Sequence, residues 1–192
     1  PLAVANAVNY AYLNLDYVVV GRTLGATALG VYLLAFNISS WPYAILGGTI
    51  NSVTLPAFSE GDEGTRLQRV EVGLQLVALI AFPIAAVLAA LAGPLVATVY
   101  GAEWSAAGTV LASLAPYGAG FLVTLTLGNL LVGAGRPGQL LWLQVLWLAV
   151  LAPAMWFLVR AVGLQGAAWA HVAVLFTVTG PGSPSVLANV VV

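Results

Sequence analysis

The sequence predicts an all-α membrane protein, a polytopic helical bundle of about six transmembrane helices. Of its 192 residues, 61% are hydrophobic and only 6% are charged, against roughly 25% charged residues in an ordinary soluble domain. Long uncharged intervals separate the charges, and each can supply the ~20 mainly apolar residues that a spanning helix needs. The chain has no cysteine and a formal net charge of −1. We therefore expect no disulfide, no thiolate metal site and no nucleic-acid partner.

The first two expected segments cover residues 2–20 and 29–58. The first ends at Gly21 and Arg22, just before Gly25. Within the second, Pro42 removes one helical hydrogen bond, which predicts a single long helix with a bend. The polar stretch that follows, residues 59–69, contains the main charge cluster of the chain and must lie outside the hydrocarbon core.

The remaining expected segments cover residues 72–91, 106–132, 140–158 and 162–179. The third stops before Gly93 and Pro94, and a short apolar run then reaches an aqueous turn at residues 101–103. Glycine and proline mark a second turn at residues 133–138. The sixth segment is short for a bilayer crossing, and residues 180–192 form a tail that the pattern does not assign. Residues 1–192 are thus expected to form a single transmembrane lobe.

Several stretches of the chain resemble a known transporter family. They are Asn14–Arg22, Leu24–Ala26, Ala28–Tyr32, Ala35, Pro42 and Val53–Ser59, with Gly101–Trp104, Ala106–Ala107 and Gly135–Pro137 further along. These residues resemble the polysaccharide exporters, which include Wzx-type O-antigen flippases and teichuronic acid exporters, within the superfamily that also holds the MATE (multidrug and toxic compound extrusion) transporters. The resemblance implies one lobe of a two-lobe transporter, the C-terminal one, with the N-terminal lobe missing.

The resemblance also implies a function. It is the export, by alternating access, of lipid-linked oligosaccharide or polysaccharide repeat units across the bacterial cytoplasmic membrane. The implied partners are the lipid-linked glycan, membrane lipids and the missing lobe. A MATE-type cation-coupled extruder or a lipid II flippase of the same fold is the alternative. Flipping needs no covalent chemistry, so we expect no enzyme, no catalytic residue, no metal site and no cofactor, with H⁺ or Na⁺ as the coupling ion.

Asp16 is the most informative single residue. On a helix, Asn9 and Asp16 lie about 20° apart, with Asn6 and Tyr12 on the same side. An ionised side chain that faces lipid is costly, so this polar stripe should face the bundle interior or a water-filled cavity. Two interpretations stay open: Asp16 is a proton or cation site of the transport pathway, or it pairs with a basic or amide group and fixes helix packing.

The other candidates are one cation, two amides, a tyrosine and a histidine. Together with Asp16, the residues Arg22, Asn9, Asn14 and Tyr12 are our candidates for the substrate or ion pathway. Arg22 either meets a diphosphate as the substrate leaves or anchors the helix end at the membrane interface. His171, the single histidine, either has a pH-linked role or is a hydrogen-bonded packing residue.

Overall fold

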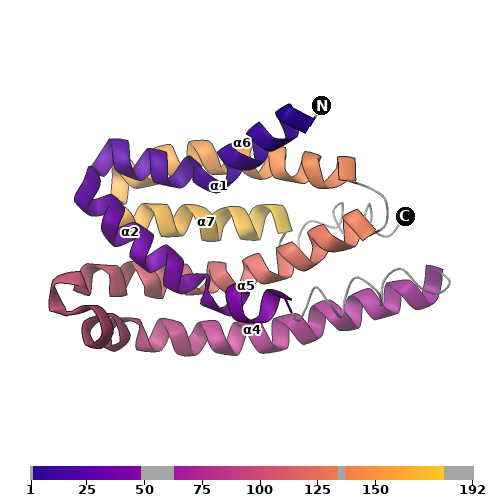
Figure 1. Ribbon diagram of the computed structural model, residues 1–192, viewed down its shortest axis with the longest axis horizontal. Coiled ribbons are helices and arrows are strands. Elements are labelled where there is room, and N and C mark those ends of the chain that lie inside the picture. Colours follow the sequence, from indigo (N-terminus) through magenta and orange to yellow (C-terminus); the bar gives the residue numbers. More distant parts are fainter. Residues whose placement is uncertain (1, 49–62, 134–136, 180–192) are drawn as a thin grey trace.

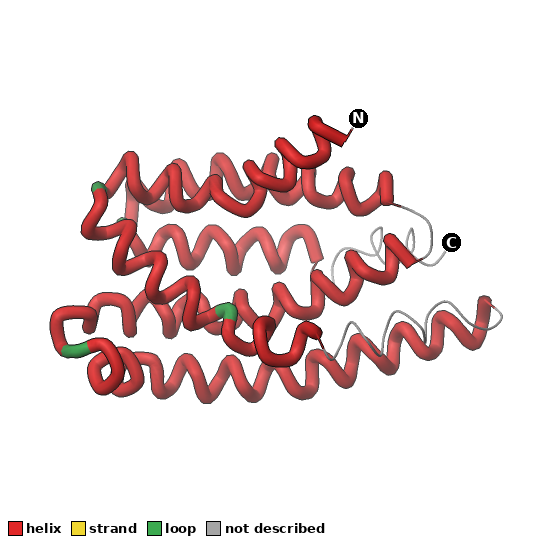
Figure 2. Tube along the Cα trace, in the orientation of Figure 1, coloured by secondary structure: helices red, strands yellow, loops and turns green. Residues whose placement is uncertain are grey.

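The computed structural model describes residues 2–48, 63–133 and 137–179. Within this part of the chain, helices joined by short turns make up the fold, with no strand (Figure 2). The elements are α1 (Leu2–Leu24), α2 (Ala26–Ser39), a helical segment over residues 41–48, α4 (Glu63–Tyr100), the short 3-10 helix η1 (Ala102–Trp104), α5 (Ser105–Gly133), α6 (Pro137–Val162) and α7 (Leu164–Thr179). The prediction of an all-α membrane bundle is confirmed.

Four segments of the described chain are long and apolar enough to cross a membrane. They are Ala26–Gly48, Val72–Tyr100, Ala102–Asn129 and Gly138–Val162. The sequence suggested about six. The polar side chains between Asn6 and Asp16 lower the hydropathy of α1, although its 23 residues make it long enough. Helix α7 has 16 residues, about 24 Å at 1.5 Å per residue, against a hydrocarbon core of about 30 Å.

The helices lie roughly side by side, with α7 in the middle of the bundle (Figure 1). It packs between α6 and α5, while α4 packs along α5 and α1 along α6. Helix α2 crosses from α1 to α5. The main core is accordingly built from buried residues of α1, α2, α4, α5, α6 and α7. Each of these helices except α4 reaches the site described below.

In its described part, residues 29–48, the second expected segment is interrupted at Ser40 rather than being one continuous bent helix. Helix α2 ends at Ser39, Ser40 forms a turn, and helical structure resumes at residue 41. The Ser39 hydroxyl donates to the Phe36 carbonyl at 2.8 Å, and the Ser40 hydroxyl donates to the Asn37 carbonyl at 2.7 Å. Such bonds back to the preceding turn bend helices. Pro42 follows in the first turn of the next piece, where its missing N–H is tolerated.

Helix α4 is longer than the expected segment 72–91 at both ends. It continues through Pro83 and Pro94 to Tyr100, and both prolines lie on its exposed face, so their rings do not push into α5. At its start, residues 63–69 of the charged stretch are helical and precede the apolar span Val72–Tyr100. The length of α4, about 57 Å, exceeds the thickness of the hydrocarbon core. Its charged end projects beyond the other helices (Figure 1).

Small residues let the helices approach closely at two crossings, that of α4 with α5 and that of α2 with α5. A Cβ atom on Gly108 of α5 would come within 2.9 Å of the Gly93 Cα of α4. Gly118 of α5 lies directly against the Ser39 carbonyl oxygen of α2. Between α4 and α5, the second core cluster contains the buried alanines Ala81, Ala85, Ala115 and Ala119. Because lipid removes most of the hydrophobic drive between helices, this close packing is what holds such bundles together.

Parts of the expected second segment and tail lie outside the described residues. These are residues 49–58 of the second segment and residues 180–192 of the tail. The expected turn at residues 133–138 is described only at its edges, where α5 ends at Gly133 and α6 begins at Pro137. Proline is favoured at the first position of a helix because its ring presets the backbone angle.

Candidate functional site

The described helices line a partly open cavity of about 620 Å³. Its walls come from α1, α2, residues 40–43, α5, α6 and α7. The volume falls within the roughly 300–1,000 Å³ that is typical of ligand sites. Aromatic rings and uncharged polar groups predominate among its larger side chains: Tyr17, Phe36, Tyr43, Tyr117, Phe121 and Trp147, with Asn14, Ser39, Thr124, Asn129 and Gln144.

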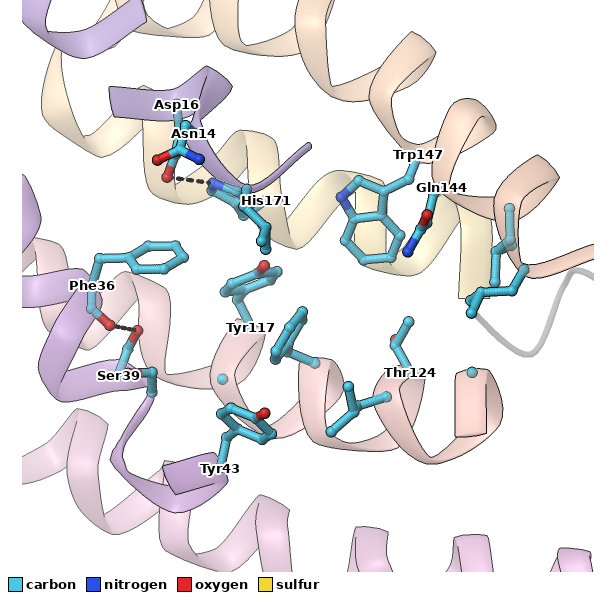
Figure 3. A pocket seen from close by; sticks show the side chains of 18 of the residues that line it. Asn14, Asp16, Phe36, Ser39, Tyr43, Tyr117, Thr124, Gln144, Trp147 and His171 are labelled. Carbon is cyan, nitrogen blue, oxygen red and sulfur yellow. Dashed lines mark hydrogen bonds and ion pairs between the residues drawn. The ribbon is translucent and has the colours of Figure 1, made fainter. Parts of the chain in front are cut away.

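One end of this cavity holds a buried polar cluster that joins three helices. Asp16 of α1 is 2% exposed, and its Oδ2 accepts a hydrogen bond of 2.9 Å from the Tyr32 hydroxyl of α2. The same Oδ2 lies 3.5 Å from Nε2 of His171 on α7. Figure 3 shows Asp16 and His171 facing each other at this end. The Tyr32 hydrogen bond therefore ties α1 to α2 at this end of the cavity.

Aromatic rings surround His171 on its other sides. Its ring centroid lies 4.5 Å from that of Tyr117 and 5.6 Å from that of Phe36. Tyr17 packs edge-on against both Tyr32 and Phe36, with centroids 6.2 Å and 5.8 Å apart. These ring contacts fix the positions of the tyrosine that holds Asp16 and of the histidine beside it.

The residues predicted from the sequence divide between the cavity and the rest of α1. Asp16 and Asn14 line the cavity, and the Asn14 amide donates to the Tyr10 carbonyl one turn earlier at 2.9 Å. Arg22 is exposed in the last turn of α1 and does not line the cavity. A cation there is favoured by the helix dipole. The side chains of Asn9 and Tyr12 lie outside the described residues.

The geometry bears on both open interpretations of Asp16 and on the expectation for His171. Asp16 lines the cavity and its Oδ2 lies 3.5 Å from a basic side chain, so its position is compatible with each of the two interpretations. His171 was expected to be either pH-linked or a hydrogen-bonded packing residue. In the structure neither of its ring nitrogens has a hydrogen-bond partner.

Several cavity residues were missed by the sequence reasoning, although signals for them exist. On α5, Tyr117, Phe121 and Thr124 share one helix face, since they are spaced by four and three residues. On α6, Gln144 is an amide in a long uncharged segment, and such a group is expected to face the protein interior. In Figure 3, Gln144 and Trp147 of α6 point toward Thr124 and Tyr117 of α5 across the cavity.

Comparison with known proteins places the chain among proteins of polysaccharide biosynthesis. The family model for polysaccharide biosynthesis proteins matches residues 1–109, which include α1, α2, α4 and the start of α5. The teichuronic acid biosynthesis protein TuaB of Bacillus subtilis is 29% identical over 131 residues, 67% of this chain and 27% of that protein. The lipopolysaccharide biosynthesis protein WzxC of Escherichia coli is 32% identical over 137 residues, 70% of this chain and 28% of that protein.

A third relative is named as a transport protein. The succinoglycan biosynthesis transport protein ExoT of Rhizobium meliloti is 27% identical over 161 residues, 83% of this chain and 30% of that protein. The chain therefore spans less than a third of the length of these relatives. No solved structure matches it. With a family match over more than half of its residues and a membrane-spanning helical fold, the chain belongs to the polysaccharide biosynthesis protein family of membrane proteins.

Proposed function

We propose that this chain is one lobe of an exporter that flips lipid-linked oligosaccharide or polysaccharide repeat units across the bacterial cytoplasmic membrane. The observation that carries the proposal is the cavity of about 620 Å³, lined by helices that include membrane-spanning ones, in a chain of this family. A large polar headgroup needs a protein-lined route, because unsatisfied polar groups cost several kcal/mol each in lipid. No covalent step is involved.

The lining of the cavity suits a sugar. Rings such as Tyr117, Phe121 and Trp147 offer apolar faces to the C–H surfaces of a pyranose. Amides such as Asn14 and Gln144 both donate and accept, as the hydroxyls of a sugar do. No Lys or Arg is among the lining residues of the described part. The diphosphate of the carrier lipid is then held elsewhere, and the exposed Arg22 at the end of α1 is our candidate for that contact.

A second lobe completes the route in this proposal. The relatives are more than three times as long as the stretch that aligns with this chain. Two lobes that rock about a shared central site would open the cavity to each side of the membrane in turn. Movement against a gradient requires a coupling ion, H⁺ or Na⁺, and Asp16 is the carboxylate at the cavity where it would act.

The test is a flipping assay with the full-length protein in proteoliposomes that contain a lipid-linked oligosaccharide. Thr124 points into the cavity from α5 (Figure 3), so Thr124→Trp should obstruct it and abolish flipping. Val87 of α4 is 58% exposed and faces away from the core, so Val87→Trp adds the same side chain and should leave flipping unchanged.

Two results would count against the proposal. Wild-type protein that flips no lipid-linked glycan, yet extrudes cationic drugs or flips lipid II, would support the alternative transporter of the same fold. Equal flipping by the Thr124→Trp and Val87→Trp variants would show that the cavity is not the route.

A further inference from the structure

His171 is a buried histidine whose ring nitrogens make no hydrogen bond to the described residues. It is 3% exposed, and neither Nδ1 nor Nε2 has a hydrogen-bond partner. Buried polar groups are nearly always paired, and each unpaired one calls for a cause. A neutral imidazole here leaves one donor and one acceptor unsatisfied. Protonation turns Nε2 into a charged N–H donor that faces Oδ2 of Asp16 across 3.5 Å.

The groups around His171 favour a single added positive charge. Asp16 and Tyr17 come from α1, Tyr32 from α2 and Tyr117 from α5. Among these groups Asp16 is the one carboxylate, and the Tyr32 hydroxyl donates to it. The Tyr117 and Phe36 rings lie within the ~6 Å at which an aromatic ring attracts a cation.

The helices α6 and α7 add no further charge at this point. Trp147 and Gln144 of α6 line the cavity and do not titrate. Arg160, the single charged residue of α6, lies 3.4 Å over the Trp156 ring instead. The sequence of α7 contains no ionisable side chain besides His171. The charge of the cluster therefore depends on one imidazole facing one carboxylate.

We infer that His171, oriented by Asp16, is the proton-binding group of this cavity, and that the coupling ion is H⁺ rather than Na⁺. The inference rests on the proposed transport function. Hard cations take oxygen ligands. The two groups that face Oδ2 of Asp16 are instead the Tyr32 hydroxyl, which already donates its hydrogen to this oxygen at 2.9 Å, and a ring nitrogen at 3.5 Å. A proton from cavity water binds the free nitrogen of the neutral ring, and the same nitrogen returns it to water when the charge is released.

The proton has a structural consequence in this arrangement. Bound, it creates an ion pair between α1 and α7 at one end of the cavity, and Tyr32 adds α2 to the same contact. Released, it leaves the carboxylate with the Tyr32 hydroxyl and removes the attraction between α1 and α7. Because α7 packs against α5 and α6 as well, the proton controls how firmly the central helix is held in the bundle.

The test uses the fact that His171 is the only histidine in the chain. The chain is labelled with ¹⁵N-histidine, purified with a tag that lacks histidine and placed in lipid nanodiscs, so that one pair of imidazole ¹⁵N signals reports on one residue. Between about pH 8 and about pH 5, we expect these signals to change from the neutral to the imidazolium form in one step. An imidazole that stays neutral across this range in folded protein overturns the inference, whatever the protein transports.

Matched variants assign the effect to Asp16. In Asp16→Asn the attraction for the added proton is removed, so we expect the imidazolium form to be lost across the same pH range. Glu103→Gln removes an exposed carboxylate from η1 and should titrate as wild type does. If Asp16→Asn also titrates like wild type, Asp16 does not orient the site and the inference fails.

A second readout connects the proton to transport. In the flipping assay, His171→Gln retains a polar side chain that cannot be protonated, so flipping should lose its dependence on a pH gradient. Flipping driven by Na⁺ with no response to pH would overturn the choice of ion, even if His171 titrates. Absence of flipping in wild type would instead count against the proposed function, and the ¹⁵N titration would still decide whether His171 binds the proton.

Discussion

The close crossing of α2 and α5 makes a sharp prediction about Gly118. This residue lies in α5, and a Cβ atom there would overlap the carbonyl oxygen of Ser39 at the end of α2. A backbone carbonyl cannot rotate away as the end of a side chain can, so Gly118→Ala must push α2 off α5. Overpacking of this kind costs about 1–3 kcal/mol. The direct overlap with backbone places this site near the upper value, about 3 kcal/mol.

Part of this cost is offset by the backbone. Replacing glycine by alanine in a helix interior stabilises by about 0.5–1 kcal/mol. The net expectation for Gly118→Ala is thus a loss of about 2 kcal/mol, which is roughly a thirtyfold change in the ratio of folded to unfolded protein. Gly30 in α2 is the matched control, because a Cβ there meets nothing within 4 Å. Gly30→Ala should therefore gain about 1 kcal/mol.

Two further glycines complete the series. Gly166 faces the Leu158 backbone carbonyl, as Gly118 faces that of Ser39, whereas Gly120 faces the side-chain end of Leu175. A side-chain end can move aside, so the expected order of destabilisation places Gly118→Ala and Gly166→Ala above Gly120→Ala. Unfolding by SDS in lipid–detergent micelles, followed by far-ultraviolet circular dichroism, measures all four variants. The reasoning is refuted if Gly118→Ala is as stable as Gly30→Ala.

Three other predictions use the same unfolding assay. Tyr32→Phe keeps the ring but removes the donor to Asp16, so it should cost about 1.5–3 kcal/mol, and an unchanged free energy of unfolding would show that the bond contributes nothing. Trp147 is 2% exposed, so Trp147→Ala should lower the free energy of unfolding by about 3–5 kcal/mol. Trp142 is 69% exposed, so Trp142→Ala should change the free energy of unfolding by no more than about 0.5 kcal/mol. Gly163 has φ +68° with open space around it, so Gly163→Ala should cost about 1–2 kcal/mol through backbone strain alone; a gain in stability would contradict this.

The charge pattern was sufficient to predict the fold class, and glycine-rich turns predicted some helix limits. Helix α5 runs from Ser105 to Gly133, one residue beyond the expected 106–132 at each end, because Gly101 and the glycines at its other end mark both limits. Helix α4 was not predictable in this way. Proline disfavours a helix interior, yet α4 continues through Pro94. Its packing along α5 supports the helix there, and this tertiary contact cannot be predicted from the local sequence.

In the site, too, the sequence of a single helix predicts which residue faces inward, whereas the contacts of that residue depend on the neighbouring helices. The cost of a charge in lipid was enough to predict that Asp16 faces inward, and it does. The periodicity of α1 contains no information about which residue meets it. His171 lies on the last described helix, and its contact with Asp16 exists because α7 is enclosed between α5, α6 and α1.

The position of the cavity follows from helix length. Helix α7 has 16 residues, about 24 Å, whereas its neighbours α5 and α6 have 29 and 26 residues, about 44 Å and 39 Å. Gly120 of α5 meets Leu175, close to the end of α7 at Thr179. The lining residues later in α5, such as Thr124 and Gly128, therefore lie near and past the last turn of α7. Within the described residues, α7 therefore packs along only part of the length of α5 and α6, and the cavity lining continues past its last turn.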